Sequence, residues 1–220
     1  MPSRQPVVIV LCGGTSRRLA GRDKTRESLG GTTVMDYLLD GLPTGWLVLC
    51  VGEEHATTRS VQWCRESPAG GGPVAGIAAG LQYLKDLLRP EPCELSKHSD
   101  HSDHSDHSEL SEHSAAEICV VVGGDMPFAA PAIPALVETL RTQPGLDAVL
   151  ATDGGGRAQP LLAAYRCAVL RAALPRQPGG AQLMPVIDAL VTGTLPSDSQ
   201  ITLDVDTPEA LEKARHIVGA

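Results

Sequence analysis

Short runs of consecutive apolar residues recur along the chain and alternate with segments that have the apolar spacing of helices. The apolar runs predict buried strands, because they are too short for helices and are bounded by glycine, proline or polar residues. They span 7–11, 46–51, 117–122 and 147–151, with a shorter one at 60–64. The helical segments span 33–42, 74–88 and 132–141. This alternation predicts a mostly parallel sheet with helices on both faces.

The last third of the sequence follows the same order less regularly. A strand is expected over 159–165, and helices are expected near 166–174, 181–191 and 207–218. A chain of 220 residues suits one domain of this kind, because a single α/β domain of that size buries a sizeable core. We therefore predict a single domain over residues 1–220.

One segment departs from this order. Ser96–Ser114 is a tripeptide repeat of His, Ser and an acidic residue, with too few apolar side chains to offset the entropy cost of ordering it. We predict an insertion without stable structure at about residues 94–114. Its imidazoles could bind Ni²⁺, Zn²⁺ or Cu²⁺ when neutral. A His-rich, transition-metal-binding protein is therefore an alternative of a different functional class.

The formal net charge of -8 is concentrated in the same segment. Between Glu94 and Glu117 there are seven acidic residues and one lysine, which gives -6 and leaves -2 for the rest of the chain. Proteins that bind DNA or RNA usually carry a clustered excess of Lys and Arg. Nucleic acid is therefore not expected as a partner.

The cysteines and the N-terminus indicate the compartment. The six cysteines form no C-x-x-C pair and several lie inside apolar runs, as is typical of reduced, buried thiols. Residues 1–12 have neither the length nor the cleavage site of a secretion signal, and no apolar run approaches the ~18 residues of a membrane span. We expect a cytoplasmic protein with no membrane partner.

The loop after the first predicted strand combines glycines with cationic side chains. Residues 11–24 read LCGGTSRRLAGRDK. The backbone N–H groups at Gly13 and Gly14 and the nearby Arg and Lys side chains are the groups that bind a triphosphate. The loop matches neither G-x-x-x-x-G-K-[ST] nor G-x-G-x-x-G, so these two phosphate-binding motifs are excluded.

Two further loops carry carboxylates. Asp125 follows the predicted strand 117–122, and Asp204 and Asp206 precede a predicted helix that starts near Pro208. Ligands of parallel α/β sheets bind beyond the carboxyl ends of the strands, where these residues are expected. Each carboxylate could bind a metal ion, but capping of a following helix is an equally ordinary role for Asp.

Taken together, these loops resemble those of the molybdenum cofactor guanylyltransferases and their MobA-like relatives. Residues 11–24 follow the signature L-x-G-G-x-S-x-R-x-x-x-x-D-K, 124–127 follow G-D-x-P, and 204–208 follow D-x-D-T-P. GPVAG at 72–76 and QPLLA at 159–163 resemble two further family segments. The resemblance covers roughly 6–88 and 117–218, with the motifs in the family's order.

The resemblance implies a three-layer α/β/α sandwich, the Rossmann-like nucleotidyltransferase fold with a mostly parallel sheet. It implies a Mg²⁺-dependent enzyme that transfers GMP from GTP to the phosphate of the molybdopterin-bound molybdenum cofactor and releases pyrophosphate. The implied partners are GTP, molybdopterin, and proteins that deliver the cofactor or molybdoenzymes that receive it.

The resemblance also assigns roles to individual residues. The implied catalytic residues are Lys24, Asp125 and Arg18, and the implied metal ligands are Asp125, Asp204 and Asp206. The implied nucleotide-binding residues are Leu11, Cys12, Gly13, Gly14, Lys24, Gly52, Ser67 and Asp125.

The chain departs from the family pattern around the nucleoside. Cys12 replaces the commoner Ala, Gly52 stands where many relatives have Asn, and Ser67 or Glu66 stands where many have Asp. A related nucleotidyltransferase that uses CTP or another phospho-acceptor is therefore the nearest alternative. The Gly13-Gly14 pair favours the guanylyl branch, because cytidylyl relatives usually have Ala-Gly there.

Overall fold

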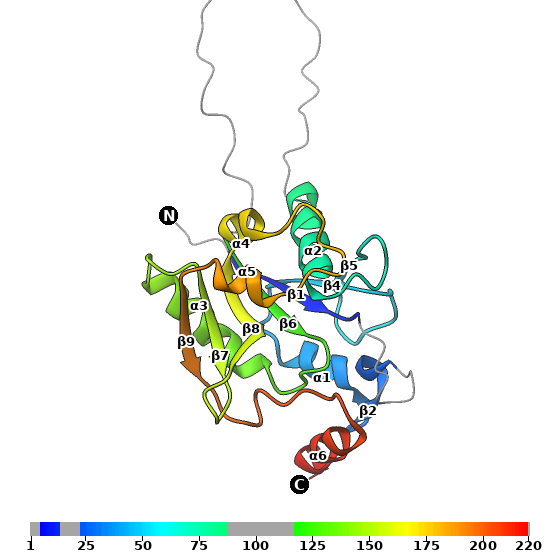
Figure 1. Cartoon of the computed structure of the whole chain (residues 1–220). Coiled ribbons are helices and arrows are strands. Elements are labelled where there is room, and N and C mark those ends of the chain that lie inside the picture. Colours follow the sequence, from blue (N-terminus) through cyan, green and yellow to red (C-terminus); the bar gives the residue numbers. More distant parts are fainter. Residues whose placement is uncertain (1–4, 14–22, 88–116, 220) are drawn as a thin grey trace, which may run out of the picture.

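The computed structural model describes residues 5–13, 23–87 and 117–219. Their centre is a seven-stranded sheet in the order β5-β4-β1-β6-β8-β7-β9 (Figure 1). The strands are β1 (Val7–Leu11), β4 (Leu47–Val51), β5 (Gln62–Cys64), β6 (Ile118–Gly123), β7 (Ala148–Thr152), β8 (Ala158–Arg166) and β9 (Thr192–Pro196). Within this sheet β8 runs antiparallel to its neighbours β6 and β7, and the other pairings are parallel.

Helices cover both faces of the sheet. The α-helices are α1 (Val34–Gly41), α2 (Pro73–Leu87), α3 (Ile133–Thr142), α4 (Cys167–Ala173), α5 (Met184–Asp188) and α6 (Pro208–Gly219), with 3-10 turns η2 (Lys24–Arg26) and η3 (Ala130–Ala132). Helices α1 and α3 pack on one face, and α2, α4 and α5 pack on the other. The predicted three-layer α/β/α sandwich with a mostly parallel sheet is thus confirmed.

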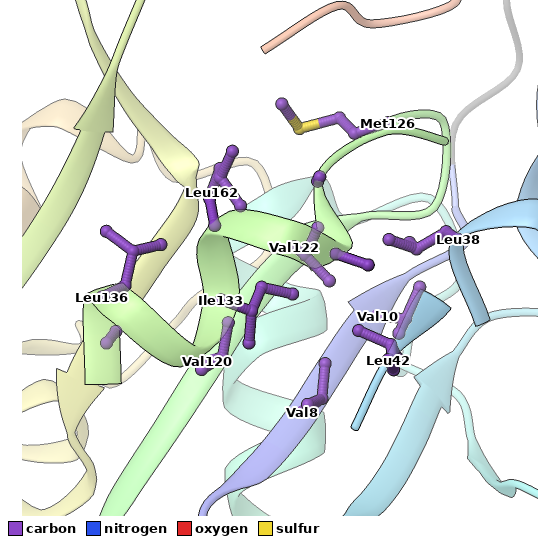
Figure 2. Packing of buried hydrophobic residues seen from close by; sticks show 14 of the residues in the cluster. Val8, Val10, Leu38, Leu42, Val120, Val122, Met126, Ile133, Leu136 and Leu162 are labelled. Atoms are coloured by element: carbon purple, nitrogen blue, oxygen red, sulfur yellow. The ribbon is translucent and has the colours of Figure 1, made fainter. Parts of the chain in front are cut away.

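The continuous apolar runs are explained by burial on both faces. Along β1, Val8 and Val10 join the core under α1 and α3, whereas Val7 and Ile9 join the core under α2. Figure 2 shows side chains from the sheet meeting those of α1 and α3. Because each such side chain contributes roughly 1.5–3 kcal/mol when fully buried, these two layers hold the sheet together.

Several elements differ from the sequence expectation. The edge strand β9 and the hairpin of β2 (Ser28–Leu29) and β3 (Thr32–Thr33) carry no continuous apolar run and were not predicted. The helix expected over 181–191 spans only α5. The short strand β9, with the sequence TGTLP, is stabilised by its pairing with β7. A local sequence pattern gives no sign of such a pairing.

A satellite core joins the C-terminal helix to the main sandwich. It consists of Leu29, Val34, Phe128, Val205, Leu211 and Ala214. The Tyr37 ring packs edge-on against Phe128 with centroids 5.4 Å apart. This packing brings the segment before α6 to the carboxyl end of β6.

The predicted insertion at about 94–114 lies outside the described residues. Its flanking elements are described: α2 starts at the carboxyl edge of the sheet and runs back to the amino edge, where β6 begins (Figure 1). In the described part of the chain, no helix is long and apolar enough to cross a membrane.

Candidate active site

The loops that follow β1, β4 and β6 are joined by backbone hydrogen bonds. Cys12 donates its N–H to the carbonyl of Val51 at 2.9 Å, and Gly124 donates to the carbonyl of Leu11 at 2.9 Å. At Gly124 a Cβ would lie 3.2 Å from the Leu11 carbonyl oxygen, so a larger residue would press the two loops apart. The carboxyl edge of the sheet is therefore a fixed platform.

This platform forms the floor of a cleft of about 560 Å³, a size that suits a small-molecule ligand. Its wall on the far side is the start of α2, where Gly72 and Pro73 lie. The cleft is lined by Leu11, Cys12, Gly13, Asp23, Val51, Gly52, Glu53, Arg65, Glu66, Ala69, Gly70, Gly72, Pro73, Gly76, Gly123, Asp125 and Leu161. Five of the residues proposed from the sequence to bind nucleotide are in this set: Leu11, Cys12, Gly13, Gly52 and Asp125.

Glu66 reaches across the cleft towards the first loop. Its Oε1 accepts the N–H of Gly70 at 2.9 Å and lies 3.6 Å from the position that a Cβ would take on Gly13. Ser67 is exposed and does not line the cleft. Of the two residues that the sequence left open at this place, Glu66 lines the cleft and Ser67 does not.

Lys24 is held on a short turn at the rim of the cleft. The Asp23 carboxylate accepts the backbone N–H of Thr25 at 3.0 Å and its hydroxyl at 2.6 Å, which fixes the start of η2. From this turn the Lys24 ammonium donates to Asp125 Oδ2 at 3.0 Å and to Asp206 Oδ1. The side chains of Lys24, Asp125 and Asp206 are 16%, 25% and 38% exposed, so the cluster is only partly hydrated.

The acidic segment before α6 is anchored by its backbone. Val205 donates its N–H to the carbonyl of Asp125 at 2.9 Å, and its side chain is buried in the satellite core. The Thr207 hydroxyl accepts the N–H of Ala210 at 3.2 Å and so caps α6. Capping is thus supplied by Thr207, and the Asp206 carboxylate is turned to Lys24.

A family model matches the greater part of the chain. The model described as the MobA-like NTP transferase domain matches residues 8–192. The chain belongs to this family. Among curated proteins, a molybdenum cofactor guanylyltransferase from Rhodopseudomonas palustris (strain HaA2) is 29% identical over 86 residues, which cover 37% of this chain and 40% of the relative. The matched part is therefore less than half of that relative's length.

Solved structures share the fold over almost the whole chain. Molybdopterin-guanine dinucleotide biosynthesis protein A from Archaeoglobus fulgidus has a TM-score of 0.67 at 20% identity, covering 97% of this chain and 98% of that one. Rv0371c from Mycobacterium tuberculosis H37Rv, solved in complex with manganese, gives 0.59 at 18% identity, covering 97% and 99%. A 2-C-methyl-D-erythritol 4-phosphate cytidylyltransferase from Thermus thermophilus gives 0.62 at 13% identity, covering 99% and 100%. At these identities the likeness establishes the nucleotidyltransferase fold.

In this MobA-like domain, the pKa values of Lys24 and Asp204 are both raised in the surroundings of Asp125 and Asp206. Burial favours the neutral form of Lys24, but the hydrogen bond to Asp206 and the contacts with Asp125 outweigh it and raise the pKa of the ammonium. Desolvation, followed by the charges of Asp206 and Asp125, raises the pKa of the Asp204 carboxyl. The three carboxylates therefore form a region of negative charge that favours a cation.

The carboxylates of the MobA-like domain fit a divalent cation. Among the described residues, no three His, Cys, Asp or Glu side chains lie close enough to form a complete metal cage. Mg²⁺ usually takes one or two carboxylates and completes its shell with water and substrate phosphates. Asp125 and Asp206 both contact one cationic group, the Lys24 ammonium, so this pair of carboxylates could hold a cation in this open manner.

The remaining sequence-derived residues fall into two groups. Gly14 and Arg18 lie outside the described residues. Cys12 is described, and its buried thiol contacts Met35 Sδ at 3.4 Å in the core under α1. A hydrogen bond with Cys50, together with burial, raises the pKa of Cys12 well above its usual value. The Cys12 thiol therefore stays neutral and packs in the core, although Cys12 also lines the cleft.

Two charged residues of the cleft were not found from the sequence. Glu53 and Arg65 follow β4 and β5 and line the cleft. Their positions directly after predicted strands were the available signal, because the carboxyl ends of parallel strands share one edge.

Proposed function

We propose that this nucleotidyltransferase is a molybdenum cofactor guanylyltransferase. An oxygen of the molybdopterin phosphate attacks the α-phosphorus of GTP. The bond from that phosphorus to the bridging oxygen of the β-phosphate breaks, and pyrophosphate leaves. The product is the guanine dinucleotide form of the cofactor. Cofactor-delivery proteins and molybdoenzymes are the partners that this activity would require.

The observation that carries the proposal is the convergence of Lys24, Asp125 and Asp206 beside a cleft whose floor is built from glycine-rich loops. The transfer needs no protein nucleophile, because phosphoryl chemistry depends mainly on positioning and charge neutralisation. Because Asp125 lines the cleft, a triphosphate bound there would have its phosphates beside Asp125 and the residues around it.

Each residue then has a defined task. The backbone from Leu11 to Gly13 receives the nucleotide, and Lys24 neutralises charge on its phosphates. Asp125 and Asp206 would hold Mg²⁺, with Asp204 adding negative charge beside them. When bound, the metal ion supplies Lewis-acid stabilisation of the charge that develops on the phosphate oxygens. Manganese in the related Rv0371c structure supports a divalent cation in this family.

Guanine is favoured by the carboxylate of Glu66. Guanine presents two neighbouring donors, N1–H and the 2-amino group, to which one carboxylate can be a paired acceptor. Cytosine presents only its 4-amino group as a donor on the corresponding edge. Glu66 faces Gly13 across the cleft, where a base next to the first loop would lie. The shared fold also fits the CTP-using alternative. Cytosine, however, has no pair of donors that would need the Glu66 carboxylate as acceptor.

The test is direct detection of both products. Purified protein is incubated with molybdopterin carrying molybdenum, GTP and Mg²⁺, and mass spectrometry follows the guanine dinucleotide cofactor while a coupled assay follows pyrophosphate. We expect equal amounts of the two products and none without the acceptor. Pyrophosphate without the dinucleotide would show a different acceptor, and neither product would reject the proposal.

A further inference from the structure

Lys24 contacts the same two carboxylates that the proposed function gives to the metal ion. Its ammonium donates to Asp125 Oδ2 at 3.0 Å and also to Asp206 Oδ1, so one cationic group joins both side chains. A Mg²⁺ ion shared by these carboxylates would need oxygens about 2.1 Å away and would take the space between them. The ammonium and the ion cannot both fill that space.

We infer that Lys24 and the divalent cation compete for Asp125 and Asp206. A bound triphosphate draws the Lys24 ammonium into the cleft and so leaves the two carboxylates to the metal ion. Metal binding then depends on nucleotide binding. The inference rests on the proposed role of the two carboxylates as metal ligands, and it adds an order of binding to that role.

The geometry around Lys24 permits this exchange without movement of the backbone. Asp23 fixes the turn through its bonds to Thr25, and the same Asp23 lines the cleft. A long Lys side chain can therefore turn from the acid pair towards phosphates beside Asp125, which also lines the cleft. The backbone segments that carry the two carboxylates stay joined, because the Val205 N–H bonds to the carbonyl of Asp125 and Val205 is itself buried.

The charges explain why the exchange needs a triphosphate. In the described part of the chain, the Lys24 ammonium is the cation that contacts Asp125 and Asp206, and Asp204 lies beside them. A metal ion alone must displace that ammonium into water. A triphosphate offers the ammonium several anionic oxygens and offers the metal ion further ligands. Metal and triphosphate therefore strengthen each other's binding, and this coupling is reciprocal.

The test is Mn²⁺ binding without nucleotide, followed by the electron paramagnetic resonance signal of free Mn²⁺. Lys24→Met removes the competing charge and keeps the apolar stem. It should bind Mn²⁺ alone at least about tenfold more tightly than the natural protein, which is within the usual range of coupling between two ligands. The same variant should bind GTP more weakly, so the two affinities change in opposite directions.

Two variants control for charge and folding. Lys24→Arg keeps a cation and should keep weak Mn²⁺ binding. Arg26→Met removes the same charge from the same turn, but Arg26 pairs with Asp23 at 3.3 Å and not with the acid pair, so its Mn²⁺ affinity should change by less than about threefold. Mn²⁺ should also raise the Tm of Lys24→Met more than that of the natural protein, which shows that the variant is folded.

Equal Mn²⁺ affinities in the natural protein and Lys24→Met would overturn the inference, as would an equal gain in Arg26→Met. Failure of Lys24→Met to bind Mn²⁺ at all would overturn it as well. None of these results depends on which nucleotide or acceptor is used. Failure of the guanylyl assignment would instead appear in the product assay, with the Mn²⁺ results unchanged.

Discussion

The backbone N–H of Val205 donates a 2.9 Å hydrogen bond to the carbonyl oxygen of Asp125. This bond joins the loop after β6 to the segment before α6, and it places Asp206 beside Lys24. Because the joint is made by backbone atoms, the carboxylates can be changed without removing it. Substitutions of these carboxylates therefore test their chemistry without breaking the bond that joins the two segments.

Asp125→Asn should abolish transfer and leave the fold intact. A ligand charge beside the reacting phosphate is worth several kcal/mol, so the rate should fall by much more than about tenfold. Pyrophosphate release measures the rate, and circular dichroism with a Tm measurement checks the fold. A loss smaller than about tenfold in a folded variant would contradict the assignment of Asp125 as a metal ligand.

Replacing Asp204 or Asp206 with Asn should change the stability of the protein in opposite directions. Asp206→Asn removes a partner of Lys24 and should lower both transfer and stability. Asp204→Asn removes a carboxylate whose pKa is raised by desolvation and by Asp206 and Asp125, so it should raise stability at pH 7 in metal-free buffer.

The stability gain of Asp204→Asn should depend on pH, because the pKa of Asp204 is raised in the folded protein. The folded pKa lies above the ordinary value of 3.8, so ionised Asp204 destabilises the fold above the raised pKa and has no such effect below 3.8. The stability gain of Asp204→Asn should therefore disappear as the pH falls through this window. Urea unfolding between pH 3 and pH 7 measures it, and a gain that stays constant with pH would be inconsistent with a charge effect.

Glu66→Gln should reduce the preference for GTP. The amide keeps an acceptor for the Gly70 N–H but places an NH₂ group where a carboxylate oxygen could accept from guanine. We expect kcat/KM for GTP to fall at least about tenfold and that for CTP to change by less than about threefold. Glu53→Gln is the matched control, because Glu53 is the second glutamate that lines the cleft. Equal losses for both nucleotides would exclude a role in base choice.

Most of the fold could be predicted from the sequence. Continuous apolar runs such as Val7–Leu11 and Ile118–Val122 are strands buried on both faces, and this pattern is local and strong. The antiparallel orientation of β8 and the existence of β9 could not be predicted in the same way. Both depend on pairing with β7, which is decided by long-range contacts.

The candidate site was predicted less completely. The sequence placed Asp125 and Lys24 in neighbouring loops, because parallel strands end at one edge. It did not indicate that Lys24 contacts Asp206, because that contact depends on the satellite core around Val205. It also left Ser67 and Glu66 as alternatives, since the path of the chain before α2 decides which of them faces the cleft.

Replacing residues 94–114 with a short Gly/Ser linker should leave transfer within about twofold, because each doubling of loop length costs only ~0.6 kcal/mol. The elements on either side, α2 and β6, end and begin at the amino edge of the sheet, away from Asp125. The shortened protein should lose most of its weak Ni²⁺ and Zn²⁺ binding, measured by calorimetry. A folded, shortened protein that has lost transfer would place this segment in the active site.

The central claim is tested most directly by the ratio of kcat/KM for GTP to that for CTP. Pyrophosphate release is measured with molybdopterin, Mg²⁺ and each of GTP, CTP, ATP and UTP in turn. We predict that GTP exceeds CTP by at least about tenfold, equivalent to ~1.4 kcal/mol of differential transition-state binding. CTP turnover equal to or faster than GTP turnover would contradict guanylyl transfer.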